Sequence, residues 1–107
     1  MLSPDSNWPI HIEDKQGRHI YLTQERWEHA LGHPGMSDSL LKSAIETIRS
    51  GQRTQDKFDP NKYKYSQEFH DLPMLYTHFV VVVKFGWKDH PPQANNFVLT
   101  AYMIEKW

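Results

Sequence analysis

Four consecutive valines, Val80–Val83, constrain the fold of this chain more than any other feature. Valine branches at Cβ, which restricts its side chain and favours extended backbone. The surrounding run, Tyr76–Phe85 (YTHFVVVVKF), does not alternate between polar and apolar residues at its centre, as is typical of a strand covered on both faces. We therefore expect a central strand here. Phe97–Met103 predicts a partner strand, paired antiparallel across a polar loop over residues 86–96.

The N-terminal part of the chain predicts a short β-hairpin. Ile10–Glu13 and Arg18–Leu22 both alternate between apolar and polar residues, and Asp14–Gly17 between them is rich in turn-forming residues. An ordered loop is the alternative structure for this segment.

A helix is expected directly after the hairpin. Thr23 is a good N-cap, Glu25 lies in the first turn where negative charge is favoured, and Gly32 and Pro34 terminate the segment. The apolar side chains share one face at helical spacing, namely those of Trp27, Ala30 and Leu31.

The rest of the chain completes an α+β pattern. A second helix is expected from Ser37 or Asp38 to Gly51, and residues 53–58 and Lys62–Ser66 predict two more strands. The predicted fold is two N-terminal helices packed on one face of a four-stranded antiparallel β-sheet, preceded by the short hairpin. Residues 1–9 are expected to form an irregular lead-in to a single domain over residues 10–107.

Composition excludes several classes of site and protein. The 107 residues include no cysteine, which excludes disulfides, thiolate metal ligands and a cysteine nucleophile. The formal net charge of −1 argues against strong nonspecific binding to nucleic acid, although seven histidines can add positive charge near neutral pH.

No signal-peptide pattern is visible, and the longest apolar run is too short to cross a bilayer. The expected localisation is cytoplasmic, without a membrane partner.

The first helix carries a second face that suits acid–base chemistry. Arg26, His29 and His33 follow one another at i, i+3 and i+7, which places them on one side of a helix. Cleavage of RNA requires a base for the 2′-hydroxyl, an acid for the leaving oxygen and a cation for the phosphate charge. These three residues can supply those groups. The structural alternative is that Arg26 pairs with a carboxylate while the histidines only cap or pack.

Two strands add candidates for phosphate binding. Lys84 follows the valine run and Thr100 lies in the partner strand, so the two could approach one another and face the helix. Lys84 would contribute charge, and Thr100 with Tyr102 on the same strand face would donate hydrogen bonds. The alternative is that Lys84 simply marks the point at which the strand reaches solvent.

The segment Lys62–Tyr65 interleaves lysine and tyrosine, so a strand would present lysines on one face and rings on the other. Aromatic rings beside cations suit single-stranded RNA, and we expect substrate binding by Lys62, Lys64 and Tyr65. The alternative is an edge strand protected by lysine.

The histidines of the first helix could instead bind a metal ion. His29 and His33 at i, i+4 can chelate an ion from one helix, but no third ligand has a diagnostic spacing. We expect no cofactor. If the histidines did bind a metal ion, they would indicate a metal-dependent hydrolase.

Three segments resemble the nuclease superfamily of barnase, EndoU, colicins and RelE, known as the BECR fold. Tyr21–Leu31 followed by His33-Pro34 resembles the opening motif of small phage- and toxin-associated members, and Val80–Lys84 and Phe97–Tyr102 resemble their closing strands. The resemblance implies metal-independent endonucleolytic cleavage of RNA, often tRNA or ribosome-associated mRNA. By position it carries the family's site onto six residues, Arg26, His29, His33, Lys84, Thr100 and Tyr102.

Two hypotheses of different kinds follow. The first is an endoribonuclease of toxin type, with an RNA substrate and a cognate antitoxin or immunity protein as partner. The second is an inactive nuclease-like module that binds protein, as a phage accessory or inhibitor domain, through exposed aromatics such as Trp8, Trp87 and Trp107.

Overall fold

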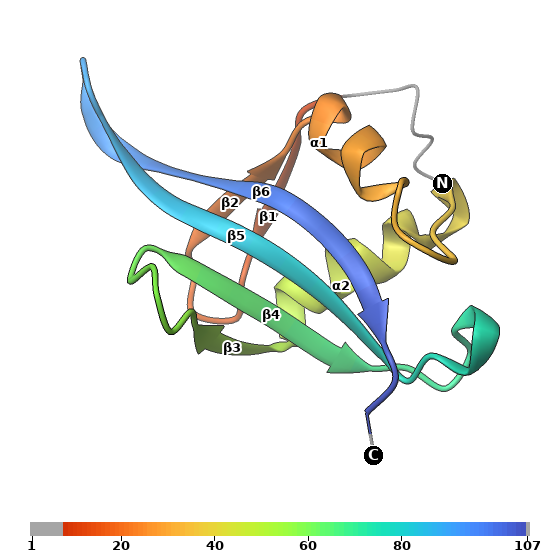
Figure 1. Ribbon diagram of the computed structural model, residues 1–107. Helices are drawn as coiled ribbons and strands as arrows, with labels where there is room; N and C mark the ends of the chain where they lie inside the picture. Colours follow the sequence, from red (N-terminus) through yellow and green to blue (C-terminus); the bar gives the residue numbers. More distant parts are fainter. Residues whose placement is uncertain (1–7, 107) are drawn as a thin grey trace.

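The computed structural model describes residues 8–106 of the chain (Figure 1). Six strands, two α-helices and two short 3₁₀ turns follow in the order β1 Ile10–Glu13, β2 His19–Leu22, α1 Gln24–Ala30, η1 Asp38–Leu40, α2 Leu41–Ser50, β3 Gln52–Gln55, β4 Lys62–Glu68, η2 Pro73–Leu75, β5 His78–Asp89 and β6 Pro92–Ile104. The strands form one sheet in the order β1-β2-β6-β5-β4-β3.

The sheet corrects the fold predicted from the sequence. The hairpin is present, with Ile10 opposite Leu22 and Glu13 opposite His19, but it belongs to the sheet rather than preceding it. Its second strand, β2, pairs with the last strand, β6, and this pairing is parallel. The prediction of a four-stranded antiparallel sheet is therefore wrong. The structure has a six-stranded mixed sheet, and both helices follow β1 and β2 in the chain.

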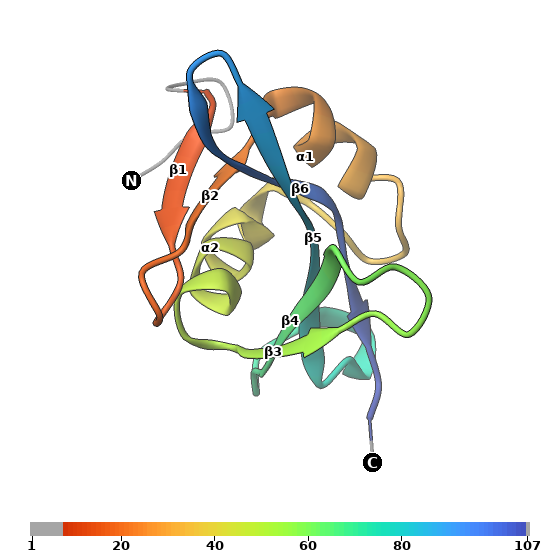
Figure 2. The ribbon, with the colours of Figure 1, turned by 90° about the vertical axis from the view of Figure 1, so that its left-hand side faces the viewer.

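The sheet curls around α2, so that one of its faces encloses the core (Figure 2). Helix α2 packs against β5, β4 and β1. The buried cluster takes alternate residues of β5, namely Phe79, Val81 and Val83, together with Val98, Ala101 and Met103 of β6. We call this the inner face. Val80 and Val82 are also buried but lie on the opposite, outer face and outside that cluster, so β5 is covered on both faces, as its sequence predicts.

Helix α1 begins as its sequence predicts. Thr23 has extended backbone, and its Oγ1 accepts a hydrogen bond from the backbone nitrogen of Arg26 at 3.2 Å. Trp27 and Ala30 are each 1% exposed. The indole nitrogen of Trp27 donates to Asp38 Oδ1 at 2.9 Å, which ties α1 to the start of η1. A buried polar N–H therefore has its partner.

The prediction of a loop over residues 86–96 is also wrong, because β5 and β6 continue through most of this segment. They remain paired from His78 opposite Ile104 to Asp89 opposite Pro92, and only His90 and Pro91 connect them. Beyond the end of β4 at Lys62, the two strands project from the sheet as an arm (Figure 1).

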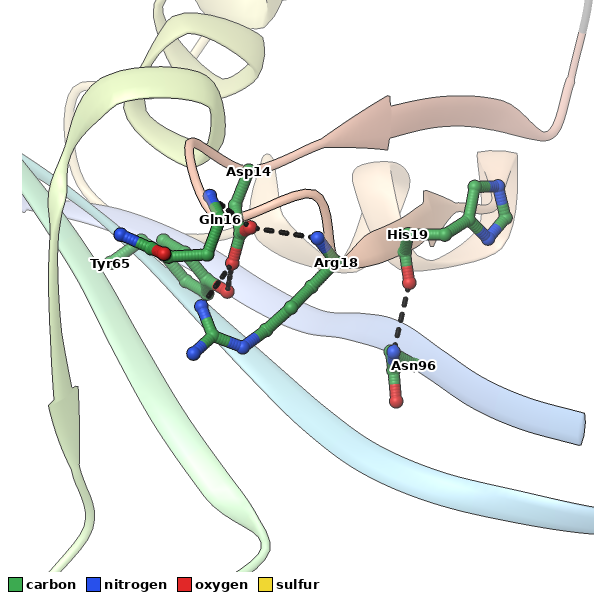
Figure 3. Close-up of polar contacts among 6 residues, drawn as sticks. All are labelled: Asp14, Gln16, Arg18, His19, Tyr65 and Asn96. Carbon is green, nitrogen blue, oxygen red and sulfur yellow. Dashed lines mark hydrogen bonds and ion pairs between the residues drawn. The ribbon is translucent and has the colours of Figure 1, made fainter.

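The tip of the β1–β2 hairpin is fixed to the far side of the sheet by Asp14 (Figure 3). This carboxylate is 6% exposed. It accepts hydrogen bonds from the backbone nitrogens of Gln16 and Arg18, from the Arg18 guanidinium at 3.0 Å and from the Tyr65 hydroxyl of β4 at 2.6 Å. Burial alone would raise the pKa of Asp14, but these hydrogen bonds outweigh it and hold the pKa below the ordinary value.

Within residues 8–106, no helix has the length and apolar character that crossing a membrane requires.

Candidate functional site

His33 contacts the last strand from the segment that follows α1. Its backbone nitrogen donates to Ala30 O at 3.0 Å, which continues the turn beyond the helix. Its Nε2 lies 3.1 Å from Thr100 Oγ1 on β6. Among the described residues, β2 and β6 are paired at a single position, Tyr21 opposite Phe97. Past that pair, α1 packs beside β6.

A β-bulge in β6 directs Thr100 toward His33. The register shifts between Val82, which is opposite Thr100, and Val83, which is opposite Val98. Residues two apart in a regular strand share a face, but the additional residue, Leu99, places Val98 on the inner face and Thr100 on the outer face. Bulges commonly redirect side chains near functional sites.

Tyr102 and His29 complete a cluster on either side of His33. Tyr102 is opposite Val80 and so shares the outer face with Thr100, as predicted. Its ring centroid is 5.6 Å from that of His33. The ring of His29, in the last turn of α1, lies 6.2 Å from His33 in an edge-to-face arrangement. His29 is exposed, whereas His33, Thr100 and Tyr102 are half-buried. We call these four residues the histidine cluster.

The predicted lysines lie across the outer face from the histidine cluster. Lys64 is opposite Val82, which is opposite Thr100, so the three form one row across β4, β5 and β6. Two strand spacings separate the backbones of Lys64 and Thr100 by about 10 Å. Lys62 is opposite Lys84 in the neighbouring row. The outer face thus carries Thr100 and Tyr102 on β6 and three lysines, Lys62, Lys64 and Lys84, on β4 and β5.

Lys84 is not in the predicted position. It lies on the outer face, as Thr100 does, but it is opposite Phe97 rather than Thr100. Its Nζ forms an ion pair with Asp59 in the β3–β4 loop. The hydrogen bond from Lys84 is the main cause of a lowered pKa at Asp59, and the backbone nitrogen of Asn61 adds to it. The charge of Lys84 is therefore already partnered.

Tyr65 is not available to substrate, which corrects its predicted role. It is 1% exposed, and its hydroxyl donates to Asp14. Burial, followed by this hydrogen bond and the charge of Asp14, raises the pKa of Tyr65 strongly, so the phenol remains a donor. The alternation in the sequence is correct, because the tyrosines of β4 and the lysines of β4 lie on different faces. The face with the tyrosines is the one that packs.

Arg26 lies one turn before His29 in α1 and is half-buried. Among residues 8–106 its guanidinium has no ion pair with a carboxylate, so the structural alternative for this residue is not supported there. The same residues contain no group of three or more histidine, aspartate and glutamate side chains that could hold a metal ion.

Two imidazoles, one hydroxyl and one phenol thus meet at a partly open surface. The Thr100 hydroxyl can donate to His33 or accept from it, depending on the imidazole tautomer. Such an arrangement can move protons and hold an anion. The sequence predicts all four of these residues as site residues. It does not predict that Asp59 pairs with Lys84, because two residues 25 positions apart in the chain leave no local pattern.

No family model, curated protein or solved structure matches this chain.

Proposed function

We propose that this protein is a metal-independent endoribonuclease of toxin type, acting on tRNA or ribosome-associated mRNA. The observation that carries the proposal is the meeting of His29, His33, Thr100 and Tyr102 from two distant parts of the chain. The sequence predicts acid–base and phosphate-binding roles for these residues, and their side chains lie together in space.

In the proposed reaction, one histidine takes the proton of the ribose 2′-hydroxyl as its oxygen attacks the adjacent phosphorus. The bond from phosphorus to the 5′-oxygen then breaks, and the other histidine donates a proton to that oxygen. The products are a 2′,3′-cyclic phosphate and a free 5′-hydroxyl. His29 and His33 fill the two roles, since histidine serves as acid or base near neutral pH.

The neighbouring groups stabilise the charge that develops on the phosphate. Thr100 and Tyr102 donate hydrogen bonds to its oxygens, and Arg26 supplies a guanidinium from the same side of α1. Lys62 and Lys64 on the outer face bind the flanking backbone. Since base, acid and cation are all side chains, the reaction needs no metal.

The test is incubation of the purified chain with total tRNA and with translating ribosomes in EDTA. The expected result is discrete cleavage with 2′,3′-cyclic phosphate ends, lost in His29→Ala and Arg26→Ala variants of unchanged thermal stability. His70→Ala is the matched control, because His70 is an exposed histidine in the segment between β4 and η2. Folded wild-type protein that cleaves neither substrate would refute the proposal.

A protein-binding role for the same chain is the second candidate, favoured by exposed apolar side chains. Met74 and Leu75 in η2 are 68% and 82% exposed, and Trp87 is 63% exposed. Trp8 is instead half-buried against the core, and Trp107 lies outside the described residues. This candidate gains if the folded protein is inactive on both substrates. An antitoxin or immunity protein remains the partner expected under the nuclease proposal.

A further inference from the structure

A hollow region lies on the inner face of the sheet, away from the histidine cluster. One cavity of about 670 Å³ lies between the β1–β2 hairpin and the base of the β5–β6 arm, lined by residues that include Arg18, Phe85 and Trp87. A second cavity of about 400 Å³ lies beside β3 and is lined by Asp14, Arg18 and Arg53, among others. Arg18 lines both cavities, and Arg53 of the second packs on the ring of Phe85 in the first. We call them together the inner groove.

The groove is positively charged. Lys15, Arg18 and Arg53 line it, against a single carboxylate, Asp14. That carboxylate is already engaged by Arg18, Tyr65 and two backbone nitrogens (Figure 3). Within residues 8–106, Arg53 has no carboxylate partner. The groove therefore has cationic charge left over in a protein whose net charge is −1.

Arg53 is held in place by aromatic rings. Its guanidinium carbon lies 3.5 Å from the ring centroid of Tyr63 and 4.7 Å from that of Phe85. The two rings meet edge to face at 5.1 Å. Its Nε is enclosed and has no hydrogen-bond partner among the described residues. A guanidinium stacked in this way is preorganised for an anion, because little side-chain freedom is lost on binding.

Trp87 continues the row of rings toward solvent. Val83, Phe85 and Trp87 alternate along β5, so all three point to the inner face. Trp87 is 63% exposed and stands on the arm beyond the end of β4. Asn96, from the partner strand of the arm, donates to His19 O at 2.9 Å and fixes the hairpin against the arm's base (Figure 3). Cations and an exposed ring thus share one groove.

We propose that the inner groove binds single-stranded RNA, with an unpaired base stacked on Trp87 and phosphates held by Arg53 and Arg18. A positively charged groove with aromatic stacking surfaces is the usual combination for single strands. The choice of RNA as the strand rests on the proposed nuclease function. The groove lies on the sheet face opposite Thr100, so it is a binding site separate from the histidine cluster.

The test is fluorescence anisotropy of a labelled single-stranded oligouridine whose riboses carry 2′-O-methyl groups, so that attack by the 2′-oxygen cannot occur. Trp87→Ala and Arg53→Gln are each expected to weaken binding about 5-fold or more. Arg53→Gln should also reduce the slope of log affinity against log salt by about 0.7, as expected for one lost phosphate contact.

Two matched controls separate the groove from the general surface. Phe58→Ala removes a ring that is 94% exposed and lies in the β3–β4 loop. Lys88→Gln removes a cation next to Trp87 that alternation places on the other face of the arm. Both should bind within about 2-fold of wild type. Equal weakening in the controls would overturn the proposal, as would full affinity in Trp87→Ala or equally tight binding of duplex RNA.

Folding and cleavage are controlled separately. If Arg53→Gln does not fold, the experiment uses Lys15→Gln in its place, together with Trp87→Ala. Lys15 lines the same groove at an exposed position. His70→Ala, at an exposed histidine outside both the groove and the histidine cluster, should bind the oligonucleotide like wild type. Groove-dependent binding without any cleavage of natural RNA would reject the nuclease and retain the groove, whereas cleavage with no dependence on Trp87 or Arg53 would reject the groove alone.

Discussion

The imidazole Nε2 of His33 lies 3.1 Å from Oγ1 of Thr100, although 67 residues separate the two in the chain. The contact joins the end of α1 to the outer face of β6, and a bulge at Leu99 makes it geometrically possible. Neither side chain is needed to fill the inner core. Functional and structural roles can therefore be separated by mutation at this pair.

Replacing His33 by alanine is expected to lower RNA cleavage about 100-fold or more, the range typical of losing a general acid or base. Thr100→Val, which keeps the shape but removes the hydroxyl, is expected to lower it about 10-fold. Thermal melts should show little change in either variant, because both residues are half-buried and outside the core cluster. Initial cleavage rates with a defined RNA provide the measurement.

The control for this pair is His90→Ala, at the exposed tip of the β5–β6 arm. Cleavage by this variant should equal that of wild type. A large loss of melting temperature in His33→Ala with unchanged specific activity would show that the His33–Thr100 contact is structural only.

Replacing Tyr65 by phenylalanine is expected to destabilise the fold by about 1–3 kcal/mol at neutral pH, since a buried charged acceptor loses a donor. The hydrogen bonds to Asp14 lower its pKa in the folded state. Their contribution to stability is therefore fully present above the unfolded pKa, about 3.9, and is lost as pH falls through the lower folded pKa. The difference between variant and wild type should shrink in that acid range.

Urea denaturation at several pH values measures this effect. Tyr63→Phe is the matched control, because no hydrogen bond of the Tyr63 hydroxyl is present among residues 8–106. A difference between Tyr65→Phe and wild type that stays constant down to strongly acid pH would contradict the assigned role of Asp14.

Replacing Asp59 by asparagine is expected to strengthen RNA binding about 2- to 3-fold at low ionic strength, because Lys84 loses its partner and its charge becomes available on the outer face. The gain should disappear in high salt. Asp56→Asn makes the same charge change in the same loop at a carboxylate that holds backbone nitrogens instead of Lys84. If Asp56→Asn strengthens binding equally, net charge rather than Lys84 accounts for the effect.

Replacing Gly51 by alanine is expected to destabilise the fold by about 1–3 kcal/mol through overpacking. The Gly51 backbone, with φ −74° and ψ 168°, suits any residue, but a Cβ there would lie 2.4 Å from Thr47 O and 2.7 Å from Ser66 O. Both atoms belong to backbone and cannot move aside easily. Chemical denaturation should show a small effect for Gly32→Ala, where the nearest atom is 3.3 Å away.

Local features of the sequence predicted local structure well. The N-cap at Thr23, the apolar spacing of α1 and the alternation of the β1–β2 hairpin act over a few residues, and the structure confirms each element. The four valines indicated a strand covered on both faces, which β5 is. These signals act through backbone preference and burial, which depend on near neighbours.

Long-range pairing was not predictable in the same way. The parallel contact between Tyr21 and Phe97 depends on which exposed strand edge is left for the hairpin, and an edge carries no pattern of its own. The bulge at Leu99 is equally hidden, yet it decides that Thr100 faces His33. Tyr65 illustrates the same limit, because alternation gave its face correctly but not the Asp14 carboxylate that covers it.

The single parallel pair between β2 and β6 has a consequence for synthesis on the ribosome. The hairpin is made early, but the strand that pairs with it in the described part of the sheet, β6, begins at Pro92, and the partner of His33 is Thr100. Until the last strand emerges, the hairpin edge has no strand to pair with and the histidine cluster lacks half of its members. A nascent chain of this protein therefore cannot assemble the proposed catalytic site before Thr100 and Tyr102 have been made, and such late long-range closure favours slow folding.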